Sequence, residues 1–487
     1  MALISTVYAI IFLPLATSLL CQIFTKKNIS FTLTIACLIT ILFAIIKIAP
    51  EVFSAQIISN DFELMPLSMA LEFKLDVSSI IFLTAIVLLN LIILFYYQLD
   101  IKNFLDHKDS KIFYSVYLLR VFTVIGILTS NNLLNLFLFL EVYACSFFAI
   151  FSIAKDTKVS QLSFRYFSFN SAASLLILFS FLIIYLVFGS LNLDIIKQNL
   201  VASKDVRFFT ILASLVLIGF VIKFFPFWIY FENLKNNNLL ANFFAVDSLF
   251  IKANLGIFFA IKFSYLFFID QLVATVIIFL AAILIFYSLF LLYKTKHFKL
   301  IAIYLCIISL SLILICLAVN TVKSRQAAFF YWLNFNLINL FLFIFATFLK
   351  RKFNTSSLDK ILLTANNKFF VMPLKMLIIF MAAFPFTFLF YGHWYLALES
   401  LQFNVKPISA LIICVLVITN GISLFIAIKI AAKIFTLHNN DLVPEKLAIE
   451  SHKYWLYTIS FWMLVILVYG LTFCSDLVNK LSIQFIK

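Results

Sequence analysis

Residues 128–154 read LTSNNLLNLFLFLEVYACSFFAIFSIA, and Glu141 is the only charged residue between Arg120 and Lys155. The run is long and apolar enough to cross a bilayer as a helix. A charged side chain at that depth costs roughly 2.5–3.5 kcal/mol and usually faces a partner or a water path. Snorkelling to a helix end does not fit, because Glu141 lies mid-run and its side chain is short. We interpret Glu141 as a functional intramembrane carboxylate.

The composition extends this interpretation to the whole chain. Of its 487 residues, 64% are hydrophobic and 12% are charged, and the mean hydropathy is +1.12. These values indicate a polytopic helical membrane protein without a soluble domain of ordinary size. The net charge of +15 does not indicate nucleic acid, because the basic residues lie in short loops between apolar runs.

No redox chemistry is predicted within the chain. It contains no G-x-G-x-x-G motif, its seven cysteines have no C-x-x-C spacing, and its five histidines are too scattered for haem pairs. We therefore expect no cofactor, no metal site and no enzymatic role beyond that of a subunit in a larger translocase. The cysteines are interpreted as buried structural residues.

Apolar windows predict about fourteen membrane-spanning helices. Their expected spans are 2–23, 29–49, 76–98, 111–130, 132–154, 164–189, 208–231, 240–266, 270–293, 299–322, 326–349, 369–398, 407–436 and 454–479. The loops on one side are much richer in Lys and Arg, which places both termini on the outer side, in a bacterial periplasm or its equivalent. Abundant Phe, Ile, Lys, Asn and Tyr are typical of an AT-rich genome, which is a bacterial or an organellar trait. The expected location is a bacterial inner membrane.

Prolines interrupt the seventh and the twelfth expected spans. Pro226 stands in IKFFPFWIY of the seventh, and Pro385 in MAAFPFTFLFYGHW of the twelfth. A central proline removes a backbone hydrogen bond and breaks or kinks a helix. Two broken segments five helices apart are typical of an inverted-repeat transporter with its ion site at the breaks. Two ordinary proline kinks are the alternative.

Further ionisable residues lie at membrane depth, and such groups strung through a bilayer are what a proton relay requires. They are Lys223, Asp247, Lys252, His393, Arg165 and Lys429. A desolvated Lys can exchange a proton whereas Arg cannot, so Lys223 and Lys252 are the expected carriers. For Lys429 we favour snorkelling. An ion pair between Asp247 and Lys252 with a structural role is the alternative for those two residues.

At this point the sequence resembles a known family, the antiporter-like membrane subunits L, M and N of proton-pumping NADH:quinone oxidoreductase, with the related D subunit of multisubunit cation/proton antiporters. The blocks that carry the resemblance are LEFKLDVSSIIFL (71–83, with Asp76 in place), NNLLNLFLFLEVYACSFFAI (131–150), LSFRYFSFNSAASLLILFSFLIIYLVFGSLNL (162–193), GFVIKFFPFWIYFEN (219–233), MAAFPFTFLFYGHWYLA (381–397) and NGISLFIAIKIAAKIF (420–435). The sixth- and twelfth-helix blocks are slightly more similar to subunit N.

The resemblance implies a fold of fourteen helices with two inverted five-helix repeats and a hydrophilic axis at mid-membrane. The implied organisation is three N-terminal helices in 1–105, a first repeat in 106–266, a second in 267–440 and a C-terminal helix in 441–487. It puts Glu141 on the family's essential carboxylate. Implied partners are other membrane subunits, the lipid bilayer, and protons or monovalent cations.

The chain also departs from the family pattern. The seventh-helix Lys of the family aligns with Val221, two residues before Lys223, and the eighth-helix Lys aligns with Asn254, two residues after Lys252. His393 replaces the twelfth-helix Lys or Glu. In the eleventh helix, Asn339 stands where a Lys is usual. The chain is therefore identified as a divergent paralogue.

The leading hypothesis is a proton- or cation-translocating subunit of a quinone-oxidoreductase-like complex. In it Glu141 is the entry-side carboxylate, Lys223 its switching partner, Lys252 the central relay and His393 the exit-side group. Arg165, Asp76, Asp247, Pro226 and Pro385 have supporting roles. A subunit of a cation/proton antiporter and a structural paralogue that has lost transport are the alternatives.

Overall fold

The computed structural model divides the chain into two compact units, Met1–Asp270 and Gln271–Lys487. Each unit is described below by itself. The structure describes residues 2–23, 27–55, 57–62, 71–153, 157–202, 206–224, 243, 245–264, 271–295, 297–353, 368–385, 387–401, 406–435, 462, 464–471, 478 and 480–482.

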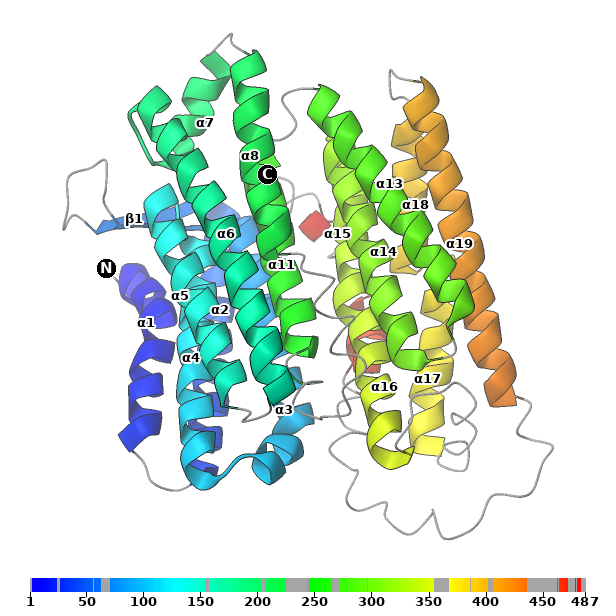
Figure 1. Ribbon diagram of the computed structural model, residues 1–487, viewed down its shortest axis with the longest axis horizontal. Helices are drawn as coiled ribbons and strands as arrows, with labels where there is room; N and C mark the ends of the chain where they lie inside the picture. Colours follow the sequence, from blue (N-terminus) through cyan, green and yellow to red (C-terminus); the bar gives the residue numbers. More distant parts are fainter. Residues whose placement is uncertain are drawn as a thin grey trace. The chain divides into compact units, whose positions relative to one another are not determined.

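The first unit is a bundle of long apolar helices with one hairpin at its side (Figure 1). Its elements are α1 (Ala2–Ile23), α2 (Lys27–Ala55), β1 (Ile57–Phe62), β2 (Leu71–Asp76), α3 (Val77–Phe104), α4 (His107–Thr129), α5 (Leu133–Ser152), α6 (Thr157–Phe188), α7 (Leu193–Ala202), α8 (Val206–Phe224), the π-helix η1 (Ser248–Lys252) and α11 (Ala253–Lys262). Polar caps set two of the starts. Asp76 accepts a hydrogen bond from the Ser79 backbone N–H at 2.7 Å, and Asn132 accepts one from the Leu134 N–H at 2.9 Å.

The hairpin corrects the expectation of an all-α chain. β1 and β2 pair antiparallel, with Ile57 opposite Asp76 and Phe62 opposite Leu71. In β2 apolar and charged residues alternate in LEFKLD, which is the period of a strand with two different faces. The fold is therefore nearly, but not wholly, helical.

The second unit is helical throughout the part described. Its elements are α13 (Gln271–Lys294), α14 (Phe298–Val319), α15 (Val322–Asn334), the π-helix η2 (Phe335–Asn339), α16 (Leu340–Phe353), α17 (Lys368–Met381), α18 (Phe388–Leu401) and α19 (Lys406–Phe435). The segment from α15 through η2 to α16 runs without a break and is almost entirely buried, so with α14 it forms the core of this unit. α15 begins with a capping box in which Thr321 and Ser324 exchange hydrogen bonds.

The predicted interruption at Pro385 is confirmed. α17 ends at Met381, α18 begins at Phe388, and Ala383 between them has a left-handed backbone with φ of 51°. Thr387 starts the second piece, since its carbonyl accepts a hydrogen bond from the Tyr391 N–H at 3.2 Å. Pro226, where the other break is expected, lies outside the described residues.

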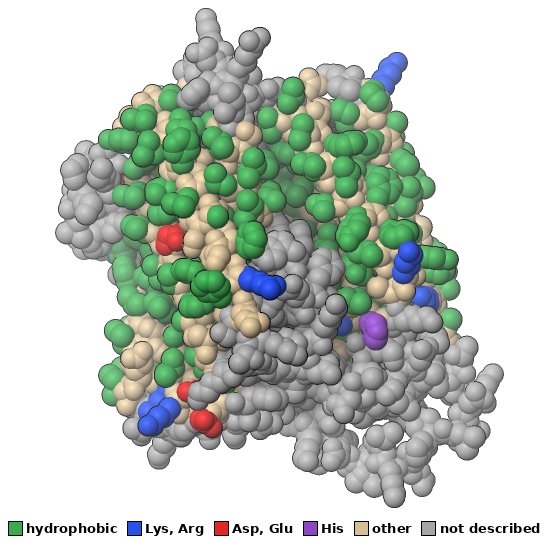
Figure 2. Space-filling model, in the orientation of Figure 1, with side chains coloured by type: hydrophobic (Ala, Val, Ile, Leu, Met, Phe, Trp, Pro, Cys, Tyr) green, Lys and Arg blue, Asp and Glu red, His purple; other side chains and the backbone are tan. Residues whose placement is uncertain are grey.

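In the described part of the chain, ten helices are long and apolar enough to cross a membrane. Their outer faces carry large apolar side chains, such as Leu175 and Leu186 on α6 and Phe279 and Phe290 on α13, and hydrophobic side chains cover most of the visible helical surface (Figure 2). Such a surface suits lipid rather than water. The chain is thus a multi-pass membrane protein, while the count of fourteen helices and the inverted repeats stay predictions.

Candidate ion-translocation site

An ion pair between Glu141 of α5 and Lys223 of α8 lies in the first unit. Lys223 Nζ is 2.8 Å from Glu141 Oε1, and the Lys223 side chain is 1% exposed whereas that of Glu141 is 36% exposed. Lys223 also donates to Ser174 Oγ of α6 at 2.7 Å. A buried ammonium requires a counter-charge and hydrogen-bond acceptors. Three helices therefore hold one proton-exchanging amine against the carboxylate singled out from the sequence.

Lys252 is the last residue of η1 and is also buried. Its Nζ donates to the Tyr166 hydroxyl of α6 at 2.6 Å and lies 4.1 Å from the centroid of the Tyr166 ring. A π-helical turn widens the helix locally and is frequent at functional sites. Lys252 is held by a hydroxyl and a π-face, which are neutral groups that stabilise an ammonium less than a carboxylate does.

Asp247 does not pair with Lys252, so that alternative is wrong. Its carboxylate instead binds the guanidinium of Arg120 on α4, with Nη2 to Oδ1 at 2.6 Å and a second contact from Nη1 to Oδ2. Both side chains are 1% exposed. Asn90 accepts from Arg120 Nη2 at 3.4 Å and from the Tyr117 hydroxyl. A two-pronged, enclosed Arg–Asp pair is a fixed structural contact, because Arg does not give up its proton.

Arg120 was not among the residues predicted at membrane depth, although the sequence contains a signal for it. Arg120 lies in the middle of the expected span 111–130. Glu141 was chosen because it lies in the middle of its own span in the same way. The structure describes two further residues with a predicted supporting role. Asp76 caps α3, as described above, and Arg165 lies on the exposed face of α6 next to Tyr166.

A polar cluster at the end of the first unit fixes the start of α5. Lys74 of β2 forms an ion pair with Asp194 of α7 at 2.7 Å, and Asn131 donates to the same carboxylate at 3.0 Å. Lys262 at the end of α11 donates to the Ser130 carbonyl at 2.6 Å. Burial alone raises the pKa of Asp194, but the hydrogen bonds from Lys74 and Asn131 and the charge of Lys74 outweigh it and hold that pKa below its ordinary value. Because residues 130–131 lead into α5, the cluster sets the position of Glu141.

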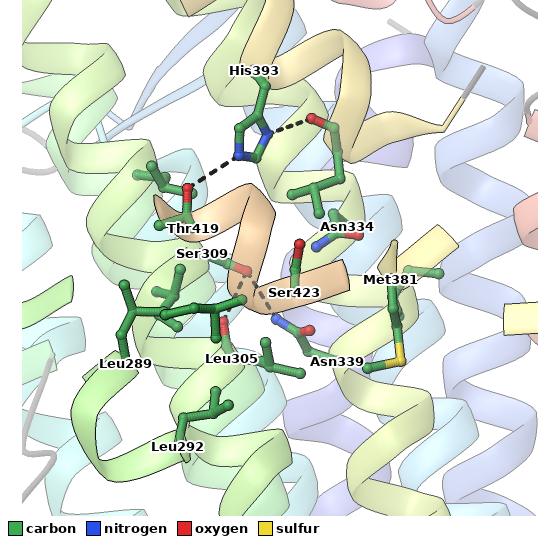
Figure 3. A pocket seen from close by; sticks show the side chains of 15 residues that line it. Leu289, Leu292, Leu305, Ser309, Asn334, Asn339, Met381, His393, Thr419 and Ser423 are labelled. Atoms are coloured by element: carbon green, nitrogen blue, oxygen red, sulfur yellow. Dashed lines mark hydrogen bonds between the residues drawn. The ribbon is translucent and has the colours of Figure 1, made fainter. Parts of the chain in front are cut away.

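His393 of α18 lies in the second unit beside a cavity of about 40 Å³ (Figure 3). Its Nδ1 is 2.7 Å from the Leu389 carbonyl and its Nε2 is 3.2 Å from Thr419 Oγ1 of α19. Since a carbonyl only accepts, Nδ1 carries a hydrogen. On another wall Asn339, the last residue of η2, donates to Ser309 Oγ at 3.0 Å. Apart from His393, the side chains lining this cavity are apolar or neutral polar groups.

The structure thus brings Glu141 and Lys223 into contact. Lys223 and Lys252 both donate hydrogen bonds to side chains of the same helix, α6. His393 belongs to the other unit and is described apart from them. Among the residues that the structure describes, no cluster of three or more His, Cys, Asp or Glu side chains could hold a metal ion.

Comparison with known proteins identifies the family. Residues 130–419 match the family model described as NADH:quinone oxidoreductase/Mrp antiporter, transmembrane. These residues form more than half of the 487-residue chain. The chain is 25% identical over 225 residues to the antiporter subunit mnhD2 of Staphylococcus saprophyticus, covering 45% of this chain and 44% of the relative. It spans less than half the length of the curated relatives that it matches.

Two solved structures share the fold. A chain of the Mrp complex from Dietzia sp. DQ12-45-1b superposes with a TM-score of 0.79 at 17% identity, covering 99% of this chain and 96% of that one. A chain of respiratory complex I from Thermus thermophilus gives a TM-score of 0.74 at 15% identity, covering 99% of both chains.

Proposed function

The chain belongs to the NADH:quinone oxidoreductase/Mrp antiporter transmembrane family, and we propose that it translocates protons, or exchanges them for monovalent cations, as one membrane subunit of a multisubunit complex. The observation that carries this proposal is the pair of Glu141 and Lys223, 2.8 Å apart, followed by the buried Lys252. All three groups are able to exchange protons. Glu141 lies on one of the ten helices that could cross a membrane, and Lys223 lies on a shorter apolar helix.

The charges of the pair explain how it can act as a switch. While Lys223 is an ammonium it stabilises Glu141 as a carboxylate, since opposite charges at this distance favour each other's ionised form. When Lys223 passes its proton inward, Glu141 loses its counter-charge and takes up a proton from the outer face of the bundle. A proton then moves from Glu141 to the Lys223 amine, and the original pair is restored.

Further residues receive roles in this proposal. Lys252 accepts the proton from Lys223 and is the central relay, and His393 is the exit-side group in the second unit. The Arg120–Asp247 pair holds η1, and therefore Lys252, against α4. Pro385 breaks the helix that leads to His393 and leaves backbone groups there for ions or water.

The exposure of Glu141 favours partner subunits. Its side chain is 36% exposed and stands beside the exposed Leu138, Val142 and Cys145 of α5. A carboxylate facing hydrocarbon at this depth is costly. A second membrane protein packed on this face of α5 removes that cost and supplies the proton path to Glu141. We place the complex in a bacterial inner membrane, with both termini of this chain on the periplasmic side.

Two parent complexes fit this proposal. A quinone-oxidoreductase-like complex is the first, by the sequence blocks listed above and the fold of the Thermus chain. A cation/proton antiporter is favoured by the curated relatives, which carry antiporter-subunit names, and by the fold of the Mrp chain. A paralogue that has lost transport is the remaining candidate. The neutral Asn339 in place of a charged residue favours it.

The test uses the complex purified through a tag on this chain and reconstituted into liposomes that contain a pH-sensitive dye. Glu141→Gln keeps the shape of the side chain and removes its charge, so we expect assembly at the wild-type level and proton flux reduced at least about tenfold. Glu51→Gln, an exposed site on α2, is the matched control and should leave the flux unchanged. Equal flux in all three proteins would assign Glu141 a packing role and favour the paralogue without transport.

The parent complex is separated by what drives the flux in the same liposomes. An antiporter dissipates a preset pH gradient when Na⁺ or K⁺ is added, and it needs no electron donor. A quinone-oxidoreductase-like complex builds a gradient only when NADH and a quinone are supplied. A response to the cation without any donor would favour the antiporter assignment.

A further inference from the structure

Helix α6 presents three polar side chains at intervals of four residues, Tyr166, Asn170 and Ser174. Residues four apart lie on one face of an α-helix, each about 6 Å further along its axis. Ser174 Oγ accepts the hydrogen bond from Lys223, and the Tyr166 hydroxyl accepts the one from Lys252. Asn170 therefore stands between the contact points of the two buried lysines.

The side-chain amide of Asn170 is 3% exposed, and neither its Nδ2 nor its Oδ1 has a hydrogen-bond partner in the described part of the chain. In two other buried asparagines of this unit, Nδ2 has a partner within its own helix. Asn90 donates to the Ile86 carbonyl and Asn254 to the Phe250 carbonyl, each at 2.8 Å. A buried amide without partners lowers stability, so the environment of Asn170 requires a ligand that its own helix does not supply.

The chemistry of the amide defines this ligand. Nδ2 needs an acceptor and Oδ1 needs a donor. A lysine ammonium offers only donors and a carboxylate only acceptors, whereas a water molecule offers both. We propose that Asn170 binds one water molecule of a hydrogen-bonded chain of waters between Lys223 and Lys252 and positions it for proton transfer along that chain. This inference rests on the function proposed above, and it makes Asn170 a positioning residue on the proton path.

The transfer is balanced in atoms and charge. One N–H bond of the Lys223 ammonium breaks as that proton joins the first water of the chain, and each water passes one of its own protons to the next. The last O–H bond to break delivers its proton to the neutral amine of Lys252. Water leaves the step unchanged, Lys223 becomes neutral and Lys252 becomes an ammonium. Asn170 forms and breaks no covalent bond, since its amide only orients the water through the hydrogen bonds at Nδ2 and Oδ1.

The test compares Asn170→Thr with Asn170→Val in the reconstituted complex. Thr and Val have nearly the same shape, but only Thr keeps a hydroxyl that binds water, so any effect of size or of β-branching on the helix is shared by both variants. We expect proton flux in Asn170→Thr to exceed that in Asn170→Val on the order of fivefold, which corresponds to about one hydrogen bond. The same pair of substitutions at Ser168, which is exposed on α6 and donates to the Phe164 carbonyl, should give equal flux.

Equal flux in Asn170→Thr and Asn170→Val would overturn the inference, and so would a difference of the same size at Ser168. Glu141→Gln is measured beside them. If Glu141→Gln abolishes the flux while the two Asn170 variants agree, the proposed function stands and the water site falls. If Glu141→Gln leaves the flux unchanged, the proposed function fails first, which is a distinguishable result.

Discussion

Two π-helical turns, η1 in the first unit and η2 in the second, invite comparison. η1 ends at Lys252, whose amine donates to the Tyr166 hydroxyl at 2.6 Å, and η2 ends at Asn339, whose amide donates to the Ser309 hydroxyl at 3.0 Å. The backbone feature and the type of contact are the same, but the nitrogen of Lys exchanges protons and that of Asn does not. The first unit therefore has the chemistry of a relay where the second has a neutral contact.

The ion pairs of the two units differ in how far their side chains are buried. Arg120 and Asp247 are enclosed in the first unit, at 1% exposure each. In the second unit Lys323 and Glu399 approach to 4.0 Å, and Lys323 is 51% exposed. The ion pair with both side chains enclosed thus lies in the unit that holds Glu141 and Lys223, which fits active transport groups there.

The largest difference between the units is expected from breaking these pairs. Arg120→Met leaves Asp247 as an unpaired buried charge and should lower the free energy of unfolding by about 3–5 kcal/mol. Lys323→Met, the matched change in the second unit, should cost less than about 1 kcal/mol because Lys323 is half exposed and lies 4.0 Å from Glu399. Thermal unfolding of the purified protein measures both. The double variant Arg120→Met with Asp247→Leu should recover most of the loss, and failure to recover would mean that Arg120 acts through contacts other than Asp247.

Next in size is the effect of the two π-helical end residues on transport. Lys252→Met removes the exchanging amine and should reduce proton flux at least about tenfold, whereas Asn339→Leu removes only a neutral hydrogen bond and should change flux by less than about threefold. Both are measured in the same liposomes. Similar losses in the two variants would contradict the unequal roles assigned to η1 and η2.

A smaller effect is expected at the cavity of the second unit. His393 is the one ionisable side chain that lines it. We expect His393→Ala to lower flux by about two- to threefold and to flatten its dependence on pH in the acidic range, while His393→Lys should move that dependence to higher pH. Identical pH profiles in wild type, His393→Ala and His393→Lys would show that the cavity takes no part in transport.

The sequence predicted single residues better than their partners. Glu141, Lys223 and Lys252 stood out because each interrupts an apolar run, and the break at Pro385 followed from the chemistry of proline. The partner of Asp247 lies 127 residues away at Arg120, a distance over which hydropathy carries no information. The neighbouring Lys252 was therefore the only partner in view, and it was the wrong one.

Two backbone features, the β-hairpin and the π-helical turns, were not predicted from the sequence, for different reasons. The hairpin of β1 and β2 had a visible signal in the alternation of LEFKLD, but the segment is short and lies between long apolar runs that dominate any hydropathy window. The π-helical turns had no signal, since Ser248–Lys252 and Phe335–Asn339 have the same composition as the α-helices on either side. Their geometry follows from packing against neighbouring helices, which only the folded chain provides.

The smallest effect is expected at the surface of the first unit, from the ion pair of Lys74 and Asp194. Unlike the enclosed pair of Arg120 and Asp247, this pair is partly exposed. Asp194 is 49% exposed and its pKa lies below its ordinary value near 3.8. Solvent screens such a pair, so Asp194→Asn should cost only about 0.5 kcal/mol or less. Because the folded-state pKa is lowered, the stabilisation is present at pH values above the unfolded-state pKa and is lost as pH falls through the folded-state pKa. The melting temperatures of wild type and Asp194→Asn should therefore differ slightly at pH ~6 and converge near pH ~3. A gap that is large at both pH values would mean that Asp194 supports the start of α5 through its hydrogen bond with Asn131 rather than through its charge.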